Sequence, residues 1–69
     1  MNRIEMLQEI VRDKQCKRIR IDGRKVYVDL FTASACVAVY NALNETNRAK
    51  YLAMPWPRFI NVTWKAVSS

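Results

Sequence analysis

The sequence contains no histidine, and only one glycine, two prolines and two cysteines among its 69 residues. The lack of histidine removes the commonest general base and metal ligand that works at neutral pH. Cys16 and Cys36 are too few for a disulfide framework or for a four-ligand zinc site. We therefore expect both cysteines to be reduced and buried as small apolar side chains, and we expect no metal and no cofactor.

Motifs for catalysis are also missing. We find no phosphate-binding loop, nucleophile elbow or catalytic histidine motif. Glu5, Glu9 and Asp13 recur at a spacing of four residues, but this spacing is typical of one solvated helix face. The sequence therefore predicts that the protein is not an enzyme.

Long hydrophobic runs are absent. The longest, Ala35 to Tyr40, falls far short of the ~20 residues that span a bilayer. The first residues contain no apolar run of signal-peptide length, so we expect a cytoplasmic protein without membrane contact.

The composition indicates one folded domain over residues 1–69. With 51% hydrophobic residues the chain is too apolar for a disordered tail. A chain of this length buries only about 60% of the surface that its unfolded form exposes. A homodimer that covers Trp56 or Trp64 would supply extra stability.

Positive charge is concentrated in one segment. The chain has 12 lysines and arginines against 6 acidic residues, which gives a net charge of +6. Half of the basic residues lie between Lys14 and Lys25, where Asp22 is the single acid. This distribution favours contact with a polyanion.

The basic segment is predicted to form a β-hairpin. Asp22-Gly23 is a strong signal for a type I′ turn, which requires positive φ at both central residues. The resulting register pairs Ile21 with Arg24, Ile19 with Val26 and Lys17 with Val28. One face then carries Ile19, Ile21, Val26, Val28 and Leu30, and the other carries Arg18, Arg20, Lys25, Tyr27 and Asp29.

The remaining segments favour helices, which makes the fold class α+β, with an N-terminal helix, the hairpin, and two or three helices packed on it. The predicted helices are Arg3 to Asp13 after an Asn2 cap, Ala33 to Leu43 after a Thr32 cap, and a short helix from the Asn44 cap to about Ala53. Residues 58–67 fit both a strand and a helix. We favour the helix because Pro57 suits a first helical turn.

The hairpin is the first candidate site. Arginine and lysine neutralise phosphates, and an exposed tyrosine stacks on bases, so we expect binding to nucleic acid or to a ribonucleoprotein. The alternative is a solvated strand face that prevents aggregation. The predicted binding residues are Lys17, Arg18, Arg20, Arg24, Lys25 and Tyr27.

A second candidate surface surrounds Trp56, which two prolines hold on a stiff loop. Tryptophan is enriched at the centres of protein interfaces, so Trp56 with Tyr51 and Arg58 is the predicted anchor of a stoichiometric inhibitor that binds an acidic surface of a host protein. The alternative is that Trp56 covers one end of the core. For Trp64 we expect a place inside the core.

The segments DGRKVYVDLFTASA (residues 22–35) and VYNALNETNRAKY (residues 39–51) resemble small uncharacterised proteins of bacteriophages and other mobile elements. The resemblance covers a little under half of the chain and includes no catalytic signature. It implies an accessory protein in the bacterial cytoplasm. Proteins of this kind often regulate genes or block a host machine, as anti-CRISPR and other counter-defence proteins do.

Overall fold

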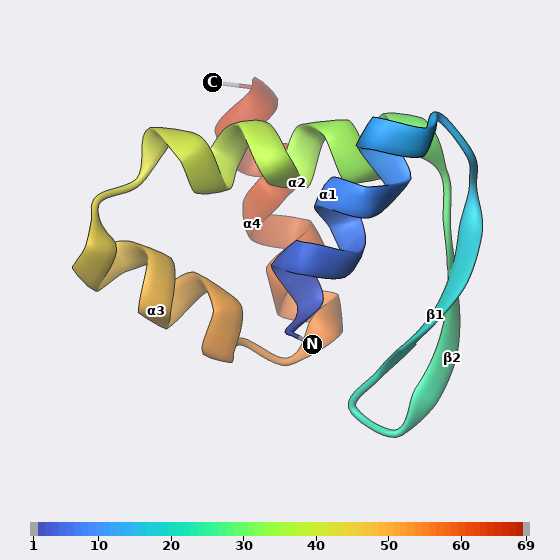
Figure 1. The fold of residues 1–69 in the computed structure, drawn as a ribbon. Coiled ribbons are helices and arrows are strands. Elements are labelled where there is room, and N and C mark those ends of the chain that lie inside the picture. The colour runs from blue at the N-terminus through green and yellow to red at the C-terminus, as the bar shows by residue number, and fades with distance from the viewer. Residues whose placement is uncertain (1, 69) are drawn as a thin grey trace.

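The computed structural model describes residues 2–68, which form a helix, a two-stranded hairpin and three further helices (Figure 1). The elements are α1 (Arg3–Asp13), β1 (Lys17–Ile21), β2 (Arg24–Val28), α2 (Leu30–Ala42), α3 (Glu45–Ala53) and α4 (Trp56–Ser68). The predicted α+β class is confirmed. None of the helices formed by residues 2–68 has both the length and the apolar character needed to cross a bilayer.

Helix α1 has the predicted bounds. The side chain of Asn2 accepts a hydrogen bond from the Glu5 N–H at 3.1 Å and so caps the first turn. Ile4, Leu7 and Ile10 are buried on one side, as their helical spacing predicts. The helix ends at Lys14, whose φ of 53° is left-handed.

The hairpin has the predicted register, with Lys17 opposite Val28 and Ile21 opposite Arg24. Asp22 and Gly23 have φ values of 51° and 80°, as a type I′ turn requires. The apolar side of the ribbon faces the helices, and Ile19, Ile21 and Val28 are buried there. Burial of this apolar side against the helices therefore determines which side chains of the hairpin point outward.

The predicted start of α2 is wrong. The helix begins at Leu30 and its cap is Asp29, whose Oδ1 accepts a hydrogen bond from the Thr32 N–H at 2.6 Å. Asp29 has extended backbone angles directly after β2, so the strand passes into the helix without a loop. Thr32 therefore lies in the first turn, and Leu43 is the C-cap rather than the last helical residue.

The two C-terminal helices agree more closely with the predictions from the sequence. Asn44 caps α3, accepting a hydrogen bond from the Asn47 N–H at 2.9 Å, as predicted. The favoured helix over residues 58–67 is confirmed as part of α4, and the strand interpretation is wrong. This helix starts two residues earlier, at Trp56, and the Pro55 carbonyl accepts the hydrogen bond from the Phe59 N–H at 2.9 Å.

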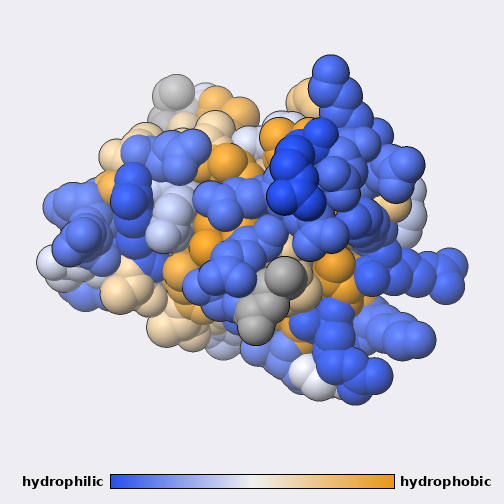
Figure 2. Space-filling model, viewed as in Figure 1, coloured by the Kyte–Doolittle hydropathy of each residue, from blue (hydrophilic) through white to orange (hydrophobic). Residues whose placement is uncertain are grey.

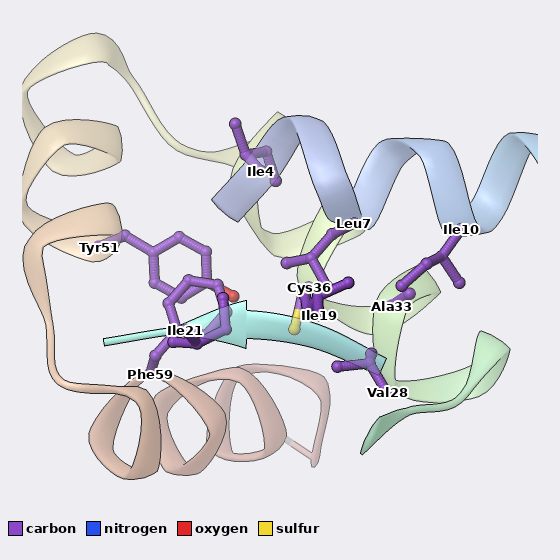
Figure 3. Packing of buried hydrophobic residues seen from close by; sticks show 10 residues of the cluster. All are labelled: Ile4, Leu7, Ile10, Ile19, Ile21, Val28, Ala33, Cys36, Tyr51 and Phe59. Carbon is purple, nitrogen blue, oxygen red and sulfur yellow. The ribbon is translucent and has the colours of Figure 1, made fainter. Parts of the chain in front are cut away.

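Helix α2 packs against both α1 and α4, and the hairpin lies along the side of this helical group (Figure 1). Tyr51 and Phe59 stack at one end of the core, with ring centroids 4.2 Å apart (Figure 3). The fully buried Thr63 donates a hydrogen bond to the Phe59 carbonyl at 2.7 Å. Trp64 is half-buried and lies outside the core cluster, stacked on the exposed Phe31 with ring centroids 5.9 Å apart, so its predicted place in the core is wrong.

Candidate nucleic-acid interface

The outward side of the hairpin presents four exposed side chains, which we call the outer hairpin face: Arg18, Arg20, Lys25 and Tyr27. The strand register places Arg18 directly opposite Tyr27 and Arg20 directly opposite Lys25. Opposite residues in an antiparallel pair have Cβ atoms only about 4.5–5.5 Å apart, so the Arg20 and Lys25 charges repel each other. Binding of an anion between them would relieve this repulsion.

The cations of this face are not neutralised within the described part of the chain. In residues 2–68 the ion pairs involve Arg3, Arg12 and Lys17, and none involves the outer hairpin face. Figure 2 shows hydrophilic side chains projecting from the side of the molecule that carries the hairpin. The face is therefore a coherent positive surface that is open to solvent.

Lys17 does not belong to this surface. It shares the inward side of β1 with Ile19, and its Nζ lies 3.0 Å from Glu9 Oε1 and 3.3 Å from Asp13 Oδ2. The hydrogen bonds to Glu9 and then to Asp13 raise the pKa of Lys17. Lys17 therefore ties β1 to α1, because alternation along the strand turns it inward, and its predicted role as a binding residue stays a prediction without support from the outer hairpin face.

Arg24 lies at the tip of the hairpin, at the edge between its inward and outward sides. It lies on the same side of β2 as Val26, but at the end of the ribbon its side chain is exposed. It borders an open groove of ≈ 420 Å³ between the hairpin tip and the start of α4. The groove is lined by Ile21, Asp22, Arg24, Val26, Trp56 and Pro57. Arg24 thus adds a cation at the rim of the outer hairpin face.

Tyr27 is the aromatic member of the face, with 63% of its surface exposed. The interaction with the Cys16 thiol raises the pKa of the Tyr27 phenol. A tyrosine phenol is in any case neutral at pH 7. Cys16 is itself exposed, against the expectation that both thiols are buried. Cys36 is buried as expected, and burial raises the pKa of its thiol.

The three residues predicted to anchor a protein partner do not form one surface. Tyr51 is only 1% exposed, and its hydroxyl forms a hydrogen bond with Thr63 Oγ1. Trp56 is half-buried and stacks on Phe59 at 5.3 Å, so it covers one end of the core. Arg58 is exposed. The prediction for Tyr51 is wrong because its polar tip finds a buried partner on α4.

No pattern in the sequence predicts the role of Arg3, which positions the hairpin tip. Its Nη1 donates to the Met54 carbonyl at 2.7 Å, and its Nη2 lies 3.4 Å from Asp22 Oδ1. The guanidinium also lies 5.0 Å from the centre of the Phe59 ring, and its side chain is only 11% exposed. Because these contacts join α1 to residues far along the chain, no local spacing predicts them.

Comparison of the chain with protein-family models, with curated proteins and with solved structures gives no match. The resemblance to small phage proteins therefore stays a prediction, and the outer hairpin face is the feature of the molecule that bears on its function.

Proposed function

We propose that the protein is a non-enzymatic binding protein whose outer hairpin face, with Arg24 at its rim, contacts nucleic acid, free or in a ribonucleoprotein. The observation that supports this proposal is a cluster of four exposed cations with no acidic partner in residues 2–68. Phosphate groups are the anions that such a cluster neutralises, and counterion release then drives binding.

A charged face that only prevents aggregation explains this arrangement less well. Alternating charges of both signs would protect a sheet face equally, and they would attract one another across the strands. The hairpin instead places Arg20 opposite Lys25, which costs folding free energy in the absence of a partner. All charges on this side within β1 and β2 are positive, and the one acid that follows on the same side, Asp29, already accepts the capping hydrogen bond of α2. The like charges support a role in binding.

The size of the face suits a short stretch of phosphate backbone. A strand of five residues is about 17 Å long at the usual rise of ~3.4 Å per residue. Duplex DNA carries one charge per ~1.7 Å of its axis, so a face of this length meets several phosphates. The neutral Tyr27 phenol adds no negative charge that would repel them.

Titration of a labelled oligonucleotide with the protein at several salt concentrations tests the proposal. We expect binding that weakens steeply with salt and that the double substitution Arg18→Gln/Arg20→Gln reduces strongly. Lys17→Gln is the matched control, because it removes a hairpin cation that is already paired with α1. Binding that does not respond to salt, or an equal loss in the control, would overturn the proposal.

A stoichiometric inhibitor of a host protein is the second candidate, because half-buried Trp56 lines an open groove beside Arg24. Affinity capture from bacterial lysate, with and without nuclease, separates the two candidates. Loss of the captured partner after nuclease treatment supports the first, and retention of a protein partner supports the second. The proposed setting, an accessory protein of a phage or mobile element in the bacterial cytoplasm, rests on the sequence resemblance alone.

A further inference from the structure

The ring of Tyr27 differs from the other six aromatic rings of the chain. Within residues 2–68 each of the others stacks on a second ring or lies under a guanidinium: Phe31 with Trp64, Tyr51 with Phe59, Trp56 with Phe59, and Tyr40 under Arg48. Tyr27 makes no such contact in the described part of the chain, and 63% of its surface is exposed. Both faces of its ring are therefore free of aromatic and cationic partners.

Tyr27 also lies among the cations that attract a phosphate backbone. Arg18 is directly opposite it on β1, and Arg20 and Lys25 form the next outward pair toward the turn. None of the three covers the ring, because the described cation–π contacts involve Arg3 and Arg48. An open ring beside exposed arginines is the arrangement on which unpaired bases stack.

We propose that the outer hairpin face binds single-stranded nucleic acid, with one base stacked on Tyr27 and the adjacent phosphates held by Arg18, Arg20 and Lys25. This inference rests on the proposed function and names its substrate class. In a duplex, neighbouring base pairs cover both faces of each base, so the Tyr27 ring has nothing to stack on. An unpaired base presents a free face, and stacking on it tolerates any sequence.

The first test measures affinity by fluorescence anisotropy with a labelled single strand of about 12 nucleotides, within the ~4–16 that single-strand-binding domains cover. The same sequence annealed to its complement serves as the duplex. We expect the single strand to bind more tightly than the duplex at equal salt. Tyr27→Leu should weaken single-strand binding roughly 5- to 150-fold, the loss typical of one stacked base.

Two further variants make this result specific. Tyr27→Phe keeps the ring and should retain single-strand binding. Phe31→Leu removes another exposed ring, 76% exposed but already stacked on Trp64, and should leave affinity unchanged. Unchanged affinity in Tyr27→Leu, equal losses in Tyr27→Leu and Phe31→Leu, or a duplex that binds at least as tightly would each overturn the inference.

The second test uses the exposed thiol beside Tyr27 as a reporter of contact. A saturating single strand should slow the alkylation of Cys16 by iodoacetamide, whereas the buried Cys36 stays unreactive with and without the strand. An unchanged Cys16 rate at saturation would count against contact at Tyr27.

The two proposals fail in different ways. If neither single strands nor duplexes bind with a salt dependence, the proposed function itself falls. If Arg18→Gln/Arg20→Gln weakens binding while Tyr27→Leu does not, the nucleic-acid contact stands and base stacking on Tyr27 is refuted.

Discussion

The salt dependence of binding is the most quantitative consequence of the hairpin geometry. Affinity for single strands falls with salt with a log–log slope of about −0.7 for each phosphate neutralised. Four exposed cations are available in the hairpin, namely Arg18, Arg20, Arg24 and Lys25. If each neutralises one phosphate, the slope is about −2.8, and affinity falls roughly 50-fold between 50 and 200 mM salt.

Substitution of two of these cations changes the slope by a calculable amount. Arg18→Gln/Arg20→Gln leaves two phosphate contacts, so the slope should become shallower, about −1.4. The same salt change should then reduce affinity only roughly 7-fold. Lys17→Gln should keep the slope near −2.8, because the Lys17 ammonium is already bound to Glu9 and Asp13.

Anisotropy titrations at four or more salt concentrations measure these slopes, and circular dichroism confirms that each variant is folded. The assignment of phosphate contacts to Arg18 and Arg20 is refuted if the double variant keeps the slope of the original protein. It is also refuted if Lys17→Gln lowers the slope as much as the substitution of an outward arginine does.

The remaining predictions concern the fold that holds the face in place. Thr63→Val should lower the free energy of unfolding by about 1–3 kcal/mol, because it leaves the buried Tyr51 hydroxyl without its partner, whereas Tyr51→Phe should lower it by only about 1 kcal/mol. Urea unfolding measures both values, and the reverse order would contradict the hydrogen bond between Tyr51 and Thr63. Arg3→Met keeps an apolar side chain of similar length but removes the hydrogen bonds to the Met54 carbonyl and to Asp22, so it should lower the free energy of unfolding by about 2 kcal/mol. An unchanged urea midpoint would show that these hydrogen bonds contribute nothing to stability. Gly23→Ala should lower the free energy of unfolding by about 1–2 kcal/mol. The cost comes from backbone strain at φ 80° alone, because an added Cβ meets no atom within 4 Å, and a cost below the error of the measurement would argue against the type I′ turn. The hydrogen bond from the Thr32 N–H lowers the pKa of Asp29, so the ionised carboxylate stabilises the fold above about pH 4, and this contribution is lost as pH falls through the lowered pKa. Asp29→Asn should therefore lose less thermal stability on acidification than the original protein, and parallel acid profiles would contradict this.

Local chemistry was sufficient to predict the hairpin and most of the helices. The Asp22-Gly23 pair specifies a turn with two positive φ angles, and this turn fixes the strand register. The register in turn predicts the outward side chains by alternation. The Asn2 and Asn44 caps were predicted because a cap acts within its own first turn.

The errors arose where a side chain is satisfied by a distant segment or where two local signals compete. Asp29 and Thr32 both suit a helix cap, and the extended backbone at the end of β2 decides for Asp29. Tyr51 is buried because Thr63, on another helix, satisfies its hydroxyl. The pairing of Lys17 with Glu9 on α1 was likewise not predicted, although the alternation along β1 turns Lys17 inward.

The most direct test of the central claim maps the binding surface by NMR. Titration of the ¹⁵N-labelled protein with a single-stranded oligonucleotide should shift the amide signals of the outer hairpin face, Arg18, Arg20, Lys25 and Tyr27, in a saturable and salt-dependent way. If the shifts instead cluster on α2 and α3, or if no signal moves at a saturating concentration of the oligonucleotide, the hairpin is not the nucleic-acid interface.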